Sequence, residues 1–458
     1  MLILPNVSLF FGKQRVKALA KNALCLWLAS GFASNSWSMD VLQAYKLAVE
    51  NDRQLRAAQA QQAAGAEALP QALSRLYPSI GLSSARLSVS QDRKDGTTQY
   101  PTQNYPSQTD TLSLRQPLYN PRLWALKDQA QASVASANAN LQGEQQNLAV
   151  RLTEAYLNVL LSREREALVQ SQIKSTESRL QAAKKSFAAG VGIRTDIDEI
   201  QAQLDVLQAQ SLQAKQNILA AQSELTLLTG KPMTQDFAFD QRSFQADKLH
   251  PGELDIWLTR ALSNNNEVRY RLAQRDALQA ALLSVQTEDL PALDGLAQIS
   301  RNSGENAYFV NSRTQNRSIG VQLSMPLYQG GWFNSRQAQA QANLNEGQAM
   351  LERAELMAQN EVRKTYFVLR EGLARVAALE KARASAELVV VANQKSFQAG
   401  VRTTLDILAA EQRVVQVAVD LAEARAQSLN AWVRLHALVS MVDEISFQTV
   451  AAQLKPAN

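Results

Sequence analysis

The sequence contains very little of what most enzyme active sites are built from. It has one cysteine and two histidines, His250 and His436, which lie in unrelated sequence contexts. A zinc site without thiols would need carboxylates alone, which is uncommon. The sequence also has no glycine-rich phosphate loop after a strand and no nucleophile elbow. We therefore expect a protein that is not an enzyme and that has no cofactor or metal.

Glycine, proline and aromatic residues are scarce, with 18 Gly, 12 Pro and 6% aromatic residues in a chain of 458. Ala, Gln and Leu are abundant instead, a composition typical of long helices that pack through small side chains. The formal charge of +5 comes from the N-terminus, because Lys13, Arg15, Lys17 and Lys21 stand among residues 1–33 without an acid. The other 43 basic and 42 acidic residues nearly balance, so no basic surface for nucleic acid is expected.

The N-terminus has the order of a secretory signal peptide. The basic residues precede an apolar run, Ala23 to Leu28, and small residues follow, with cleavage expected after Ala33 or Ser38. The apolar run is too short to span a bilayer. Cys25 lies in this run, and Leu24 before it is not the small residue that a lipoprotein cleavage site needs. An exported mature chain without disulfides follows.

One short segment occurs twice, 210 residues apart: SFAAGVGIRTDI at 186–197 and SFQAGVRTTLDI at 396–407. A long helical pattern enters each copy and another leaves it. Gly190 and Gly400 can adopt the left-handed conformation that ends a helix, and a Thr or Asp can cap the next one. Either copy alone is an ordinary turn between antiparallel helices. Two copies at the ends of two similar patterns indicate an internal repeat.

The elements around the two turns repeat in the same order. The first repeat, 39–231, is predicted to contain a helix to about 74, strands at about 79–91 and 109–117, a long helix at about 121–187, a tip turn at 188–194 and a return helix. The second repeat, 252–440, is predicted to contain a helix at 253–288, strands at about 292–303 and 317–326, a long helix at about 331–398, a tip turn at 399–403 and a return helix. A linker, 232–251, joins them, and a tail, 441–458, ends the chain. The polar segments 91–108 and 301–315 are predicted loops, and a phase slip at Ser83–Ser84 predicts a β-bulge.

The long helices are the most distinctive prediction. At 1.5 Å per residue each would be about 100 Å long, more than a compact globule needs. Apolar residues of the second one follow the four-three spacing of a coiled-coil seam, namely Val362, Tyr366, Leu369, Leu373 and Val376. The fold class is therefore mostly α with a small β part.

The four predicted strands are apolar on one side only. Strands that span a membrane must close into a barrel, and barrels begin at about eight strands. A membrane-spanning form would therefore take strands from several chains. A soluble helical protein with two surface hairpins is the alternative that the pattern leaves open.

The order of elements, the two Pro-Leu-Tyr junctions at Pro117–Tyr119 and Pro326–Tyr328, and the paired Phe-x-Ala-Gly-Val turns resemble the TolC family of outer-membrane channel proteins. The resemblance covers about residues 39–440 and is closest to members that serve type I secretion. It implies a homotrimer in which four strands per chain form one 12-strand transmembrane β-barrel above a helical tunnel through the periplasm. The linker and tail would form an equatorial belt, the predicted loops would face outside the cell, and the two turns would lie at the closed periplasmic tip.

The resemblance also implies which residues close the tip. By position, Thr195 and Asp196 match a Thr-Asp pair of the first tip, Arg402 matches the Arg of the second, and Asp406 matches the acidic residue that narrows the pore. Phe397 stands where a tyrosine is expected, so one hydroxyl hydrogen bond is missing. Simple capping of the next helix is the alternative role of Thr195 and Asp196. Three copies of Asp406 around an axis would favour cations.

A second acidic ring, one turn beyond Asp406, is missing, because Ala409 stands there and Glu411 is expected to point elsewhere. A gate held less tightly, with weaker cation selectivity, is the expectation.

The resemblance implies a passive exit duct. Its partners would be two further copies of the chain, a periplasmic membrane-fusion adaptor, an inner-membrane ABC transporter and outer-membrane lipid, with no nucleic acid. Two alternatives stay open. One is a duct for drugs or other small molecules beside a proton-driven pump, and the other is a periplasmic coiled-coil scaffold.

Overall fold

The computed structural model describes residues 40–232, 237–239, 244–306 and 309–456. The predicted signal peptide lies outside these residues. The elements of the first repeat follow one another as α1 (Val41–Asn51), α2 (Arg53–Ala66), α3 (Ala68–Ser74), β1 (Ser79–Gln91), β2 (Lys94–Asp95), β3 (Thr98–Gln99), β4 (Gln103–Tyr119), α4 (Pro121–Ala188) and α5 (Arg194–Thr229). The second repeat has a similar order, with two helices instead of three before its strands and without the small β2–β3 ribbon: α6 (Leu254–Asn264), α7 (Asn266–Gln286), β6 (Ala292–Asn306), β7 (Phe309–Ser324), α8 (Trp332–Gln398) and α9 (Thr404–Leu438).

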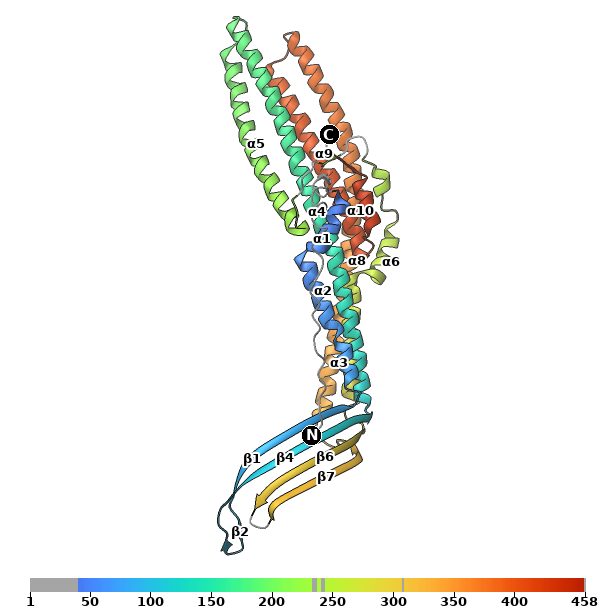
Figure 1. Cartoon of the computed structure of the whole chain (residues 1–458). Coiled ribbons are helices and arrows are strands. Elements are labelled where there is room, and N and C mark those ends of the chain that lie inside the picture. The colour runs from blue at the N-terminus through green and yellow to red at the C-terminus, as the bar shows by residue number, and fades with distance from the viewer. Residues whose placement is uncertain (1–39, 233–236, 240–243, 307–308, 457–458) are drawn as a thin grey trace, which may run out of the picture. The chain divides into compact units, whose positions relative to one another are not determined.

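Each repeat contains one very long helix that extends away from the sheet, α4 in the first and α8 in the second (Figure 1). Helix α4 has 68 residues and α8 has 67, which gives each a length of about 100 Å. Pro121 begins α4 at a position where the missing N–H has no helical partner to lose. Each long helix packs against the return helix that follows it, α4 against α5 and α8 against α9, and α4 also packs against α9.

The shorter helices are more broken than the sequence predicts. The region from 39 to 74 contains three helices. The first break is at Asp52, which stands in extended backbone and whose carboxylate accepts from the Leu55 N–H at 2.8 Å, and the second break is at Glu67. The region from 253 to 288 is divided in the same way by Asn265, whose side chain caps α7. In both places one capping side chain ends one helix and starts the next, so the single helices that were predicted there are wrong.

The four long strands form one antiparallel sheet in the order β1-β4-β6-β7. Strand β1 has the predicted bounds, and the other three strands are longer than predicted: β4 starts at Gln103, β6 continues to Asn306 and β7 starts at Phe309. Most of the predicted loop 301–315 is therefore strand. The loop predicted at 91–108 is limited to 92–102, and those residues contain the β2–β3 ribbon. Polar residues on both faces hid these strand ends, since backbone pairing needs no apolar alternation.

The predicted bulge at Ser83–Ser84 is also wrong, because Ser83 pairs with Thr111 and Ser84 with Asp110 in unbroken register. The phase slip instead marks a change of face: Leu82 is on one side of the sheet and Leu87 on the other. The register shifts in the described sheet lie between Pro117 and Tyr119 on β4 and between Gly304 and Asn306 on β6.

The largest apolar core forms where α1 and the C-terminal segment pack against the middle of the long helices. Tyr156, Leu369, Leu429 and Phe447 are fully or almost fully buried there. All five residues of the predicted coiled-coil seam on α8 are buried, which confirms that prediction.

The linker and the tail are joined. Strand β5 (Phe237–Phe239) pairs with β8 (Leu454–Pro456), and α10 (Glu444–Ala451) precedes β8 in the tail. The Gln245 N–H donates to the side chain of Gln453 at 2.7 Å, just before the short 3-10 helix η1 (Ala246–Leu249). Phe244 packs against the core and lies 5.4 Å from the guanidinium of Arg425. The described part of the linker therefore packs against the helices.

Candidate functional site

The sheet has one apolar face and one polar face. Residues paired directly across antiparallel strands share a face. One row of the apolar face across the four strands is Ile80, Leu114, Ala297 and Ile319. The neighbouring row on the other face is Gly81, Ser113, Gln298 and Ser318. The large apolar side chains of this row are exposed, and Ile319 is 90% exposed. An apolar face of this kind is expected to be covered by lipid or protein.

Aromatic side chains gather where the sheet joins the helices. All are at least 41% exposed, and they are Tyr77, Tyr119, Trp124, Tyr328 and Trp332. Tyr77, just before β1, and Arg86, on the apolar face of β1, are nine residue steps apart. At about 3.3 Å per residue and a tilt of about 40°, this distance corresponds to a band about 23 Å high, close to the apolar band of outer-membrane barrels. Aromatic residues at one border are typical of a membrane interface.

The four predicted junction residues lie at this border. Pro117 stands at the register shift of β4, and the Tyr119 ring packs edge-on against Trp124 at 5.6 Å. Pro326 and Tyr328 lie after the end of β7, in the connection to α8, where Tyr328 is 85% exposed. The two Pro-Leu-Tyr copies therefore occupy equivalent places, although only the first belongs to a strand.

Within the described residues, no helix combines the length and the hydropathy that a transmembrane helix requires.

The two predicted turns are present at the far ends of α4 and α8. Gly190 and Gly400 have φ values of 77° and 76°, a conformation that favours glycine. The Val191 N–H donates to the carbonyl of Ser186 at 3.1 Å, and the Val401 N–H donates to Ser396 at 2.9 Å. These bonds close the same helix-ending motif in both copies, as the repeated segment predicts.

The two copies differ in how the return helix begins. Thr403 caps α9, and the Asp406 carboxylate accepts from the Thr403 N–H and hydroxyl, each at 2.9 Å. The matching residue in the first copy is Ile193, which has no side-chain oxygen to cap α5. Thr195 and Asp196 lie inside the first turn of α5. The alternative that they cap this helix is therefore wrong.

The predicted gate residues lie on both hairpins, and the chain does not pair them across the hairpins. Arg402, in the turn before α9, donates to Asp406 in the first turn of that helix at 3.3 Å, and no ion pair joins Arg402 to Asp196 among the described residues. The hydrogen bonds from Thr403, together with the nearby Arg402 charge, hold the pKa of Asp406 below its usual range. Asp406 is therefore a carboxylate at neutral pH. Phe397, in the last turn of α8, is 45% exposed.

Two ion pairs that the sequence analysis missed join the hairpins. Arg179 on α4 pairs with Glu411 on α9, and Arg165 pairs with Glu423 further along the same two helices. Arg179 and Glu411 are 19% and 23% exposed, so solvent screens them only in part. The side chain of Glu411 is thus directed toward α4. The spacing of 14 residues between the two arginines, two heptads, was the available signal.

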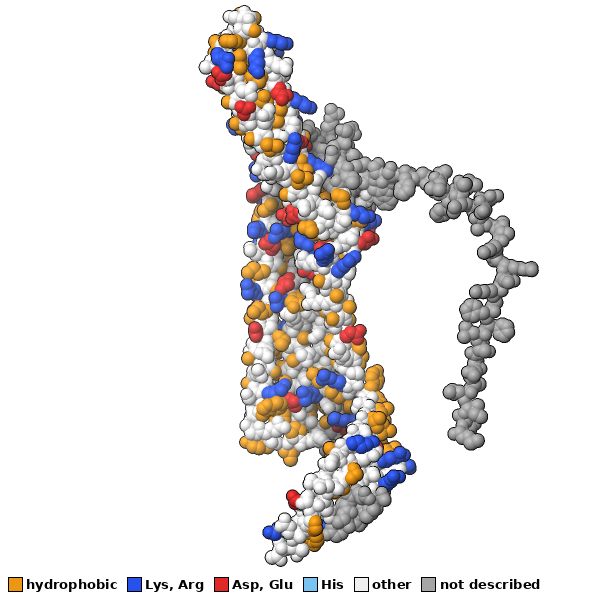
Figure 2. Space-filling model, turned by 60° about the vertical axis from the view of Figure 1, so that its left-hand side comes forward, with side chains coloured by type: hydrophobic (Ala, Val, Ile, Leu, Met, Phe, Trp, Pro, Cys, Tyr) orange, Lys and Arg blue, Asp and Glu red, His pale blue; other side chains and the backbone are white. Residues whose placement is uncertain are grey.

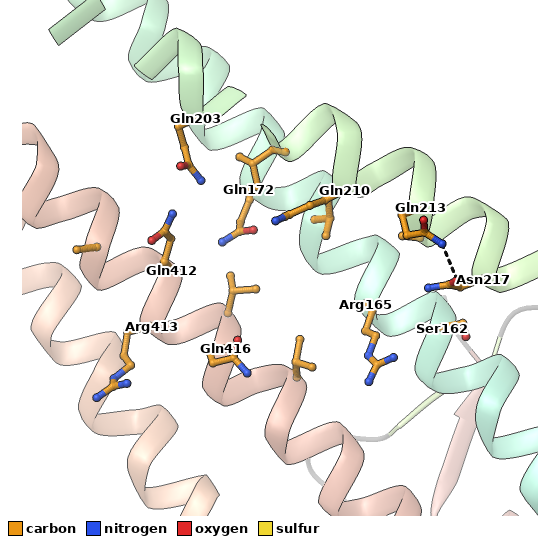
Figure 3. Close-up of a pocket in the computed structure, with 16 residues that line it drawn as sticks. Ser162, Arg165, Gln172, Gln203, Gln210, Gln213, Asn217, Gln412, Arg413 and Gln416 are labelled. Carbon is orange, nitrogen blue, oxygen red and sulfur yellow. Dashed lines mark hydrogen bonds between the residues drawn. The ribbon is translucent and has the colours of Figure 1, made fainter. Parts of the chain in front are cut away.

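A groove opens beside these ion pairs, between α5 and α9 over α4. It has a volume of about 690 Å³ and is lined by amide side chains from all three helices. Figure 3 shows Gln172, Gln203 and Gln412 pointing into the space between their helices. Gln213 is instead bonded to Asn217 along α5 at 3.1 Å. Arg165 and Arg413 line the groove as well. Because amides both donate and accept and the two guanidinium groups donate, this surface can bind another polar helix.

Known proteins share this architecture. Residues 44–231 and 257–440 match the family model described as outer membrane efflux protein. The alkaline protease secretion protein AprF of Pseudomonas aeruginosa is 31% identical over 94% of this chain and 91% of its own length. The proteases secretion protein PrtF of Dickeya chrysanthemi is 29% identical, covering 92% of each chain. A crystal structure of CusC superposes with a TM-score of 0.76 at 15% identity, covering 88% of this chain and 92% of that chain. The family model spans most of the chain and both repeats, and the chain belongs to the outer membrane efflux protein family.

Proposed function

We propose that this chain is the outer-membrane exit duct of an export system whose cargo is protein. The proposal rests mainly on the four-stranded sheet, which has one apolar and one polar face and an unpaired edge on each side. Two of its strands, β4 and β7, lead into helices about 100 Å long. The apolar face would contact lipid and the polar face would line the pore. Because the family is one of outer-membrane proteins, the alternative of a periplasmic scaffold is disfavoured.

The open edges support a trimer. Strands β1 and β7 each have one unpaired edge within the described sheet, and an open edge in lipid leaves backbone groups unsatisfied. Four strands are too few to close a ring, whereas three chains would supply a barrel of 12 strands. The hairpins α4–α5 and α8–α9 would then form the wall of a periplasmic tunnel, and the joined linker and tail would lie at its middle.

Partners follow from the passive nature of the duct. We propose a membrane-fusion adaptor that docks a helical hairpin in the amide-lined groove, and an inner-membrane ABC transporter that supplies the energy. Similarity to two protease secretion proteins favours protein as cargo. The family description, outer membrane efflux protein, favours small-molecule efflux beside a proton-driven pump as the second candidate.

Deleting the protein distinguishes the two cargoes. The culture medium of the deletion strain is expected to lose a small set of proteins, and the same proteins should accumulate in the cells. Quantitative proteomics of medium and cells measures this, with a plasmid copy of the wild-type chain as the control for restoration. Increased drug susceptibility with an unchanged set of secreted proteins would establish efflux and contradict protein secretion.

The tip residues are proposed to hold the tunnel closed through weak ties between chains. In a trimer Arg402 could reach Asp196 of a neighbouring hairpin, and such an exposed pair contributes about 0–1 kcal/mol. The double change Asp196→Ala with Arg402→Ser is expected to raise single-channel conductance in planar bilayers. Arg194→Ser is the matched control, because it removes the exposed Arg194–Asp198 pair within α5 at the same tip. Equal conductance of the double variant and wild type would rule out this latch.

A further inference from the structure

The apolar face of the sheet ends in arginines on the side far from the helices. Beyond the row of Ile80, the next rows on the same face are Leu82, Leu112, Ile299 and Arg317, then Ser84, Asp110, Arg301 and Gln315, then Arg86, Gln108, Ser303 and Arg313. These three rows hold four arginines and one carboxylate. Figure 2 shows basic side chains gathered on the sheet next to a column of apolar ones.

One arginine of this group is already paired. Arg86 donates to the Asp110 carboxylate at 2.9 Å, and Ser84 and Gln108 donate to the same side chain. This leaves a net positive charge from Arg301, Arg313 and Arg317, which are all exposed. We call these three residues the arginine rim. Their guanidinium groups present forked donors that match phosphate oxygens.

An apolar hollow adjoins the arginine rim. It has a volume of about 300 Å³ and is lined on the apolar face by Ile80, Leu112, Leu114, Ile299 and Ile319. Arg317 contributes to the same lining. A ligand that fits this surface has a hydrocarbon chain for the hollow and an anionic group for the guanidinium beside it.

The position of the rim indicates which lipid meets it. Aromatic residues mark the border of the apolar band on the helix side, and the arginine rim marks the opposite border. An arginine on the lipid face costs about 2–4 kcal/mol at the membrane centre and about 0–1 kcal/mol near an interface. In the orientation of the proposed duct, with helices in the periplasm, the rim lies in the outer leaflet. The lipid of that leaflet is a phosphorylated glycolipid, lipopolysaccharide.

We propose that the arginine rim binds the phosphate groups of the outer-leaflet glycolipid, with one acyl chain in the adjoining hollow. The inference depends on the proposed function, because it needs the sheet to lie in the outer membrane. The site would anchor the barrel at a fixed depth and orientation, since three chains would place three such rims around it.

The test uses the full mature protein, purified in detergent and inserted into phosphatidylethanolamine vesicles with or without bisphosphorylated lipid A. Retained lipid is counted by native mass spectrometry, and insertion is measured separately by channel conductance. The test variant carries Arg301→Gln, Arg313→Gln and Arg317→Gln. The matched control replaces Arg353, Arg363 and Arg375, which are exposed on α8, by Gln.

Wild type and control are expected to retain lipid A, and the rim variant is expected to retain at least about tenfold less, given the usual contribution of each basic residue at an anionic surface. Lipid A stripped of phosphate should bind all three proteins equally weakly. Equal retention of lipid A by wild type and rim variant would overturn the inference, and so would wild-type retention of phosphatidylglycerol, tested in parallel vesicles, that equals its retention of lipid A. If the proteins still conduct ions, the proposed function as a duct would stand in either case. Failure of all three proteins to insert would overturn the proposed function and this inference together.

Discussion

A lysine in place of Val321 is expected to keep the protein out of the outer membrane. Val321 is 70% exposed on the apolar face of β7, between Ile319 and Leu323, and lies opposite Gly295. A lysine near the middle of the lipid face of a barrel costs about 2–4 kcal/mol, and a trimer incurs that cost three times. Val321→Lys should therefore abolish heat-resistant oligomers in outer-membrane fractions, as measured by gel electrophoresis of unheated samples.

The neighbouring residue provides the control. Gln322 faces the other side of the same strand and pairs across it with Asp294, so Gln322→Lys places the same charge in the polar, pore-facing environment. This variant should insert and conduct ions. If Val321→Lys assembled as well as Gln322→Lys, the assignment of the apolar face to lipid would be wrong.

The phase slip at Ser83–Ser84 shows what a sequence can and cannot reveal about this sheet. The alternation of apolar residues was visible, and so was its interruption, but an interruption has two physical causes. A bulge inserts a residue, whereas a border of the lipid band reverses which face is apolar. Only the register with β4 decides between them, because Ser83 and Ser84 keep their partners Thr111 and Asp110. Beyond this point Arg86 lies on the side of the sheet that carries Ile80 and Leu82, and Leu87 lies on the opposite side.

The long helices and the turns were predictable because their signals are local. A 3.6-residue period without internal proline fixes a helix, and Gly190 and Gly400 fix where it ends. Helix breaks at Asp52 and Asn265 escaped notice because one polar residue in a helical pattern is usually a surface residue. Such a residue acts as a cap only if its own backbone is extended, and that conformation is seen only in the folded chain.

The ties between the hairpins were not predictable in the same way. The sequence predicts that Glu411 points elsewhere than the acidic ring, but its partner Arg179 lies 232 residues earlier in the sequence. Pairing them requires the register of α4 against α9, which depends on both hairpins packing around the same apolar cluster. Leu180, Ile200 and Leu408 belong to that cluster, so the ion pair and the apolar contact hold the same two hairpins together.

Reversing the charge of Arg179 should release these hairpins. Arg179→Glu would place two carboxylates side by side where Ser175 also donates to Glu411 at 3.5 Å. An exposed ion pair contributes about 0–1 kcal/mol to stability, and breaking a buried one costs about 3–5 kcal/mol. The Arg179–Glu411 pair is about one-fifth exposed and lies between these limits. We therefore expect its loss to change the free-energy difference between the closed and the open tunnel by about 2 kcal/mol. Single-channel recordings should show a larger conductance or a raised open probability.

The exchanged pair identifies the cause. Arg179→Glu combined with Glu411→Arg restores opposite charges between α4 and α9, and conductance should return to near the wild-type value. Arg271→Glu is the matched control, because it reverses an Arg–Glu pair that lies within the single helix α7 and joins no hairpins. If Arg179→Glu left conductance unchanged, or if the exchanged pair behaved like the single variant, the ion pair would not hold the tunnel closed. If the exchanged pair restores the wild-type conductance and Arg271→Glu does not change it, the contact between the two hairpins is what keeps the tunnel closed.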